Sequence, residues 1–156
     1  MEKILIIGCP GSGKTRMANA LGRKLDLPVI HLDTLWSSPR GESVTVQEFD
    51  QKLDAILEGP SWILDGNFSR TMPMRLQSCD TIIYLDHSRR ACLWGMLRQA
   101  LEGSKQINWR RLSWAYRTHE SSRTQNSTWI AQARHAQVIV LKSRKEANAF
   151  LSGQDF

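Results

Sequence analysis

Short runs of apolar residues recur along the chain, separated by segments with helical periodicity. The runs cover residues 4–7, 29–32, 62–64, 81–85 and 138–141. Each run is continuous rather than alternating, which is typical of strands that are buried on both faces of a sheet. Because helical segments lie between the runs, we predict an α/β fold in which right-handed crossovers join parallel strands and helices cover the sheet.

The intervening segments carry apolar residues at helical spacing. Two such faces are formed by Met17, Leu21 and Leu25, and by Phe49, Leu53, Ile56 and Leu57. Thr45 with Glu48 makes a capping box before the second face, and Gly59 and the following proline end that helix. Ser143 with Glu146 predicts a further capped helix at the end of the chain.

One long segment, residues 87–134, shows no strand pattern. Leu93, Leu97 and Leu101 share a helical face in it, and a stretch rich in tryptophan and arginine follows. We interpret this segment as a helical insertion that closes as a lid over a ligand and excludes water. The length of 156 residues suits one domain, so residues 1–156 are predicted to form a single unit that includes this lid.

The strongest motif spans Gly8 to Thr15 and reads Gly-Cys-Pro-Gly-Ser-Gly-Lys-Thr, the phosphate-binding pattern G-x-x-x-x-G-K-[ST]. It follows an apolar run and opens a helical segment, which is the context that the motif requires. Backbone N–H groups of the loop and the positive end of the helix would bind an anion. Lys14 would reach the terminal phosphates of a nucleotide, and the Thr15 hydroxyl would bind Mg²⁺.

Three aspartates stand at or just after predicted strands, on the edge where open parallel sheets bind ligands. Asp65 would hold Mg²⁺ through water, and Asp33 would orient an acceptor hydroxyl or share the metal. The alternative is that each aspartate caps a turn or a helix. We favour this second interpretation for Asp86.

Four further side chains are weaker candidates. Arg70 would clamp an acceptor phosphate or carboxylate, or is a solvated surface charge. Trp36 would form a wall of the acceptor pocket, or packs its own loop. Arg98, near the base of the lid, would offset charge on the transferred group, although spacing alone does not identify which lid arginine does so. For His31 we favour a structural role.

Composition restricts the partners. The net charge of +6 favours polyanions such as nucleotides, and no apolar run approaches a membrane span, so no membrane partner is expected. The three cysteines have neither paired nor metal-type spacing, and the first residues lack a signal-peptide pattern. We therefore expect a reducing, cytoplasmic environment. Cys9 lies inside the phosphate loop, where we favour a packing role over modification.

Taken together, these residues resemble the P-loop kinase superfamily, both adenylate-kinase-like and shikimate-kinase-like, and are most similar to the bacterial DNA topology modulation proteins. The segments that carry the resemblance are residues 8–15, 31–36, 62–68, 75–86, 92–94 and 138–143. The resemblance implies a three-layer αβα fold with a five-stranded parallel sheet in the order 2-3-1-4-5 and a helical lid.

The resemblance also implies roles for residues. ATP would lie on the phosphate loop, with Mg²⁺ beside Thr15, Asp33 and Asp65. The acceptor would lie near Asp33 and the residues Trp36, Gly66, Asn67 and Arg70. The residues expected to bind the nucleotide are Gly8, Pro10, Gly11, Ser12, Gly13, Lys14, Thr15, Arg16 and Arg144.

The expected function is therefore that of an ATP-dependent kinase, which moves the γ-phosphoryl group of Mg-ATP to a small-molecule or nucleotide acceptor. Lys14, Asp33 and Arg98 would be its catalytic residues. One alternative is a nucleotide-gated DNA-binding protein, supported by the arginines and tryptophans of the lid. Another is a plain ATP or GTP hydrolase. The sequence lacks the Asn/Thr-Lys-x-Asp segment with which GTPases read guanine, which favours adenine.

Overall fold

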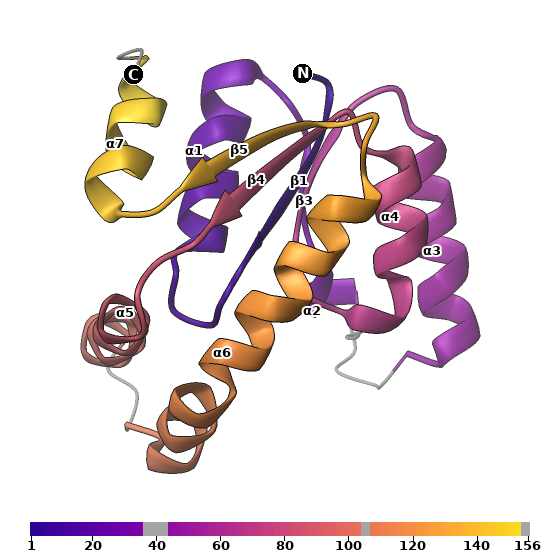
Figure 1. The fold of residues 1–156 in the computed structure, drawn as a ribbon. Coiled ribbons are helices and arrows are strands. Elements are labelled where there is room, and N and C mark those ends of the chain that lie inside the picture. The colour runs from indigo at the N-terminus through magenta and orange to yellow at the C-terminus, as the bar shows by residue number, and fades with distance from the viewer. Residues whose placement is uncertain (36–43, 104–106, 154–156) are drawn as a thin grey trace.

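The computed structural model describes residues 1–35, 44–103 and 107–153 and contains a five-stranded parallel sheet in the order β2-β3-β1-β4-β5 (Figure 1). The strands are β1 (Lys3–Gly8), β2 (Val29–His31), β3 (Trp62–Asp65), β4 (Thr81–Leu85) and β5 (Gln137–Leu141). Each strand coincides with one of the predicted apolar runs. The α/β class and the strand order are therefore confirmed.

Helices cover both faces of this sheet. They are α1 (Lys14–Leu25), α2 (Leu32–Leu35), α3 (Val46–Glu58), α4 (Met72–Ser78), α5 (Arg89–Glu102), α6 (Trp109–Gln132) and α7 (Arg144–Ser152), with a short 3-10 turn η1 (Ser69–Thr71) before α4. Figure 1 shows α1 and α7 on one face and α3, α4 and α6 on the other. The capping box predicted at Thr45 begins α3. Ser143 caps α7 by accepting from the N–H of Glu146, but the Glu146 carboxylate accepts from the N–H of Lys142 instead of completing the box. The three-layer arrangement is confirmed.

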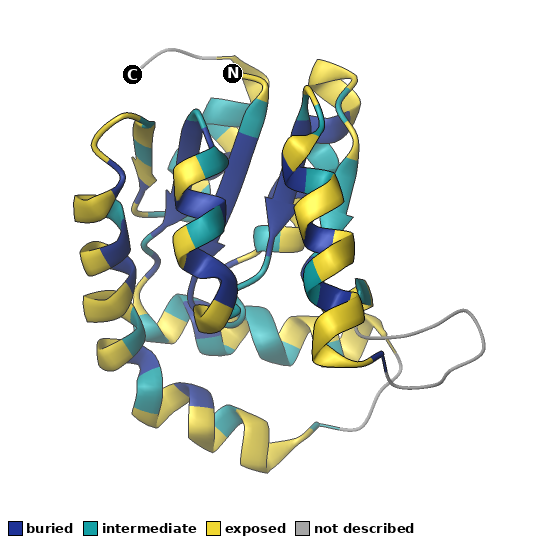
Figure 2. Ribbon diagram, turned by 90° about the vertical axis from the view of Figure 1, so that its right-hand side faces the viewer, coloured by how far each residue is buried: buried dark blue, intermediate teal, exposed yellow. Residues whose placement is uncertain are grey.

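Each face of the sheet has its own hydrophobic core, because successive strand residues point in opposite directions. Along β1, Ile4 and Ile6 pack toward α1 and α7, whereas Leu5 and Ile7 pack toward α3, α4 and α6. Figure 2 shows buried residues along the strands and the inner sides of the helices. The central strands are buried on both faces, as their continuous apolar runs predicted.

The edge strand β5 differs from that prediction. Val138 and Val140 are 36% and 42% exposed, while Leu141 is buried against the α1 and α7 side. The reason is that α6 packs against β1 and α4, so it covers the centre of the sheet rather than its edge. Only one face of β5 is therefore buried.

The predicted lid, residues 87–134, consists of α5 and α6, and part of it belongs to the core. Trp129 and Ala133, near the end of α6, are buried with residues of the central strands. The first half of α6 is mostly exposed (Figure 2). The segment that could cover a ligand is therefore α5 with the first half of α6. In the described parts of the chain, no helix has the length and apolar character needed to cross a bilayer.

Candidate nucleotide-binding site

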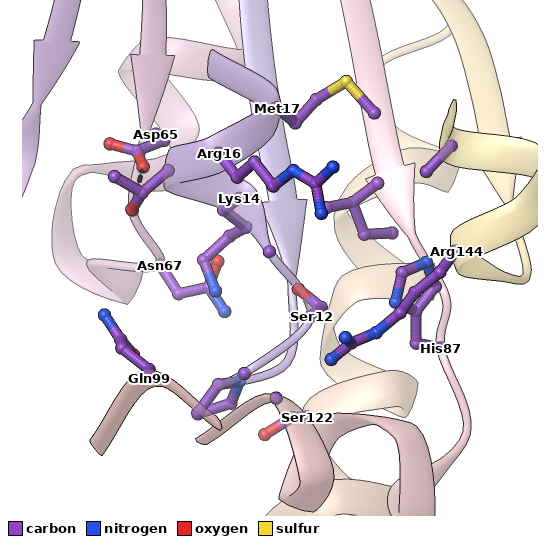
Figure 3. Close-up of a pocket in the computed structure, with 18 of the residues that line it drawn as sticks. Ser12, Lys14, Arg16, Met17, Asp65, Asn67, His87, Gln99, Ser122 and Arg144 are labelled. Atoms are coloured by element: carbon purple, nitrogen blue, oxygen red, sulfur yellow. Dashed lines mark hydrogen bonds between the residues drawn. The ribbon is translucent and has the colours of Figure 1, made fainter. Parts of the chain in front are cut away.

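A cavity of about 880 Å³ surrounds the start of α1, at the carboxyl ends of the strands. This volume lies within the range of small-molecule sites. Its walls come from the phosphate loop, the ends of β3 and β4, and the helices α5, α6 and α7. In Figure 3, Asp65 and Asn67 lie at one side of the cavity, Arg144 and His87 at the other, and Ser12 between them.

The phosphate loop at the floor of the cavity is built to receive an anion. Gly13 precedes the first residue of α1 and offers no side chain to cap the helix, and the first turn of α1 carries no acidic residue. The N–H groups of that turn are thus left for a ligand. The hydroxyl of Ser12 is buried and hydrogen-bonds no other described residue. A phosphate group would satisfy both kinds of donor.

Lys14 curls back onto the loop that carries it. Its Nζ donates to the carbonyl oxygens of Gly8 and Cys9, at 2.9 and 3.1 Å. Burial lowers the pKa of Lys14, and the carboxylate of Asp65 partly offsets this effect. The ammonium group therefore rests on neutral acceptors inside a desolvated loop, so a phosphate oxygen would be a stronger partner.

Asp65, at the end of β3, is the centre of a polar group beside Lys14. One carboxylate oxygen accepts from the Thr15 hydroxyl at 2.8 Å, and the other lies 2.7 Å from Nδ1 of His31. Nε2 of His31 lies 3.2 Å from the side-chain oxygen of Asn19. Parallel pairing places His31 opposite Asp65 in the register of β2 and β3. His31 thus orients Asp65, which agrees with a structural role.

The oxygen donors of Thr15 and Asp65 fit Mg²⁺, which prefers hard oxygen ligands and keeps several waters. Asp33 is exposed on α2 and also lines the cavity, as predicted for a residue that meets the acceptor or shares the metal. Among the described residues, no group of three or more His, Cys, Asp or Glu is placed to hold a metal by itself. A metal here would therefore depend on water and on the phosphates of a ligand.

The segment after β3 is fixed to the phosphate loop. The amide of Asn67 donates to the Gly8 carbonyl at 2.6 Å, so that Gly8 lies behind the cavity while Gly66 and Asn67 line it. The guanidinium of Arg75 is fully buried and donates to the carbonyls of Gly66 (2.7 Å) and Phe68 (2.5 Å). Burial lowers the pKa of Arg75 to about 10.

Three of the predicted arginines reach the cavity from helices. Arg98, on α5, is exposed and pairs with Glu102 at 2.6 Å. Arg144, the first residue of α7, donates to the carbonyl of Ala91 at 3.2 Å. Arg16 is an exposed residue of α1 that lines the same space. These cations surround the phosphate loop, as an anion-binding site requires.

One predicted acceptor residue, Arg70, lies outside the cavity, and another, Trp36, lies outside the described residues. Arg70 makes a bidentate pair with Asp50 on α3, at 2.8 and 2.7 Å, and lies outside the cavity lining. Trp36 falls in residues 36–43, outside the described residues. Asp86 also lies away from the lining, because its carboxylate is bound by Arg123 at 2.7 and 3.0 Å.

Residues of α6 that line the cavity were missed by the sequence analysis. The inner face of this helix follows a spacing of three and four residues through Leu112, Ala115, His119, Ser122, Asn126, Trp129 and Ala133. Ser122 and Asn126 interrupt this stripe with polar groups, and both line the cavity. Polar residues within an otherwise apolar helical stripe were the signal that could have identified them.

Comparisons with known proteins locate the fold. No protein-family model matches the chain, and no curated protein matches its sequence. Solved structures do match. A shikimate kinase from Acinetobacter baumannii in complex with shikimate has a TM-score of 0.66 at 13% identity, covering 98% of this chain and 90% of that one.

Two further structures agree. A shikimate kinase from Bacteroides thetaiotaomicron has a TM-score of 0.59 at 18% identity, covering 96% and 94% of the two chains. A deoxyadenosine kinase from M. mycoides with bound dATP has a TM-score of 0.57 at 13% identity, covering 98% of each. The chain has the P-loop kinase fold. At these identities the likeness shows the fold alone, and the similarity to DNA topology modulation proteins stays a prediction.

Proposed function

We propose that this P-loop protein is an ATP-dependent phosphotransferase that moves the γ-phosphoryl group of Mg-ATP to a small-molecule or nucleotide acceptor. The observation that carries the proposal is the unsatisfied anion site formed by Ser12, Lys14 and the start of α1. Solved kinases of the same fold support it, including one with bound dATP. The cavity is large enough for a nucleotide and a second, small ligand.

The residues around the loop have separate roles in this proposal. Lys14 exchanges its two carbonyl partners for phosphate oxygens, and Arg98 approaches the transferred group from α5. Thr15 and Asp65 hold Mg²⁺, which when bound neutralises charge on the phosphates. Arg144 lies at the opposite side of the cavity from Asp65, and in this proposal it meets the adenine side of the nucleotide.

The acceptor would bind on the Asp65 side of the cavity, beside Gly66 and Asn67. Asp33, exposed at this wall, would accept a hydrogen bond from the acceptor hydroxyl and orient it. An acceptor phosphate would have to compete with Asp50 to reach Arg70. An acceptor held through its hydroxyl groups needs no such exchange.

Replacing Lys14 with methionine tests the proposal. Kinase turnover should fall by about two to three orders of magnitude, because one charged donor to the transferred group is lost. ATP-dependent product formation is measured by mass spectrometry on a panel of nucleosides, nucleoside monophosphates, sugars and hydroxy acids. Lys52→Met, on the exposed face of α3, is the matched control and should retain activity. Folded wild-type protein that binds neither Mg-ATP nor Mg-GTP at millimolar concentration would refute the proposal.

A second candidate function is nucleic-acid binding, favoured by the exposed side of α6. Trp109, Trp114 and Tyr116 are 71%, 50% and 51% exposed, and arginines lie between them. Such a surface suits stacking on bases and contact with phosphates. If this function holds, affinity for single-stranded DNA falls steeply with salt, and Arg110→Ala reduces the slope by about one. Affinity that does not change with salt argues against it.

A further inference from the structure

Two of the three cysteines meet where the phosphate loop rests on α5. Cys9 follows the last residue of β1 and Cys92 lies in the first turns of α5, and they are 2% and 3% exposed. Their side chains interact, since each thiol is the largest influence on the pKa of the other. The Cys9 thiol also lies 3.9 Å from the His119 carbonyl, and the Cys92 thiol 3.6 Å from that of His87. The pair is thus enclosed by three separate segments of the chain.

The backbones of the loop and of α5 hold this pair together. A Cβ atom added to Gly11 would lie 2.1 Å from the carbonyl oxygen of Cys92, and one added to Gly95 would lie 2.1 Å from the carbonyl oxygen of Gly11. The backbone of Gly11, two residues after Cys9, therefore lies directly against the backbone of α5 between Cys92 and Gly95. This contact holds together the two segments that carry the thiols.

The charges around the pair make the two thiols unequal. The Cys92 thiol donates to Cys9, and His119 and Lys14 add positive potential, so the pKa of Cys9 is lowered despite burial and the nearby Asp86. The same hydrogen bond, together with burial, raises the pKa of Cys92. Of the two thiols, Cys9 is therefore the one that loses its proton first. A thiolate is the reactive form of cysteine.

The remaining cysteine is an internal reference. Cys79 lies in the other core, under α4, with its sulfur 3.4 Å from the Leu76 carbonyl. Burial raises the pKa of Cys79 to about 11. Cys79 and Cys9 are equally buried, both at 2% exposure, so a difference in their reactivity would reflect charge and partner rather than access.

We propose that Cys9 and Cys92 form a redox-active pair, which a peroxide converts into a disulfide between the phosphate loop and α5. The Cys9 thiolate attacks one peroxide oxygen, the O–O bond breaks, and the departing hydroxide takes up a proton, leaving a sulfenic acid and water. The Cys92 sulfur then attacks the Cys9 sulfur, and the hydroxyl group leaves with the thiol proton as a second water. Two thiols and one hydrogen peroxide thus give one disulfide and two waters.

The disulfide between Cys9 and Cys92 would distort the phosphate loop. A disulfide brings its sulfurs to about 2.05 Å, closer than any thiol hydrogen bond, so the loop or α5 has to shift. The Cys9 carbonyl is a partner of the Lys14 ammonium, and Ser12 follows three residues later. The oxidised protein should therefore bind a nucleotide more weakly, a consequence that rests on the proposed function.

The test treats the folded protein with hydrogen peroxide and maps its cysteines by mass spectrometry. We expect the intact chain to lose the mass of two hydrogens, a cross-linked peptide pair containing Cys9 and Cys92, and reversal by dithiothreitol. Cys9 should be oxidised at least about tenfold faster than Cys79. In Cys92→Ser, Cys9 should instead accumulate as a sulfenic acid that dimedone traps, whereas Cys79→Ser should form the bridge normally.

Three results would overturn the proposal: Cys9 stays reduced under peroxide that oxidises the urea-unfolded chain, Cys79 reacts as fast as Cys9, or the disulfide joins two molecules. Calorimetry with Mg-ATP on reduced and oxidised protein measures the effect on the loop, expected as about a tenfold loss of affinity. If reduced protein does not bind Mg-ATP, the proposed function fails while the disulfide is still judged by the mass data.

Discussion

Arg75 is a buried cation held by backbone carbonyls. Its guanidinium bonds Gly66, Phe68 and, at 3.4 Å, Thr71, and these three carbonyls belong to the turn between β3 and α4. A buried charge is tolerated when its donors are satisfied in this way. By fixing the turn, Arg75 also fixes Asn67, which reaches the phosphate loop from it. It is a positioning residue one layer behind the cavity.

Replacing Arg75 with methionine should lower the free energy of unfolding by about 3 kcal/mol, because three carbonyls in a buried or partly buried turn lose their donor. Urea denaturation followed by circular dichroism measures this loss. The free energy of unfolding of Arg75→Lys should lie between those of Arg75→Met and the wild type. An ammonium group cannot reach all three carbonyl oxygens as the planar guanidinium does. Arg23→Met, on the exposed side of α1, is the control. An Arg75→Met protein as stable as the wild type would show that the turn between β3 and α4 does not need Arg75 for its stability.

At the scale of elements, one ion pair fastens α6 to the sheet. Asp86 follows β4 and accepts two hydrogen bonds from Arg123 on α6, and the hydroxyl of Tyr84 donates to it at 3.1 Å. These partners, Arg123 foremost, lower the pKa of Asp86. The pair lies where α6 passes from its exposed first half to the part that packs in the core.

Asp86→Asn should lower the free energy of unfolding by about 1 kcal/mol near neutral pH, a modest loss because Arg123 is half exposed. The pH dependence of this stabilisation follows from the lowered pKa of Asp86. The carboxylate contributes fully above its ordinary pKa of 3.8 and loses its contribution as the pH falls through the lower native value. Unfolding curves of the variant and the wild type should therefore differ at neutral pH and converge at strongly acidic pH. Asp54→Asn is the matched control, and curves that stay apart in acid would contradict the argument.

Elements with strong local signals were predictable, and those defined by their neighbours were not. The capping box at Thr45 and the continuous run of β1 are local, so both could be located from the sequence. The single turn α2 has no periodicity to detect. Whether β5 is covered on one face or two depends on the direction in which α6 crosses the sheet. No local pattern encodes that direction.

At the scale of the molecule, the site was predictable where a motif defines it. The phosphate loop and Asp65 follow strands whose ends share an edge, so their meeting could be inferred from the sequence. The pairing of Arg70 with Asp50 joins two unremarkable positions on separate elements, and nothing in either segment indicates it. Likewise, Ser122 reaches the cavity because α6 runs from an exposed first half into the core, and this course is not encoded in its local sequence.

The absence of side chains between Gly11 and Gly95 has a mechanical result. With no compressible layer between them, α5 cannot slide over the loop at that point, so the two move as one body. Any swing of the arm formed by α5 and the first half of α6 must therefore bend beyond residue 95, or else carry the phosphate loop with it. Because Gly11 belongs to the phosphate loop, a displacement of the exposed part of this arm would be transmitted to the loop through that contact.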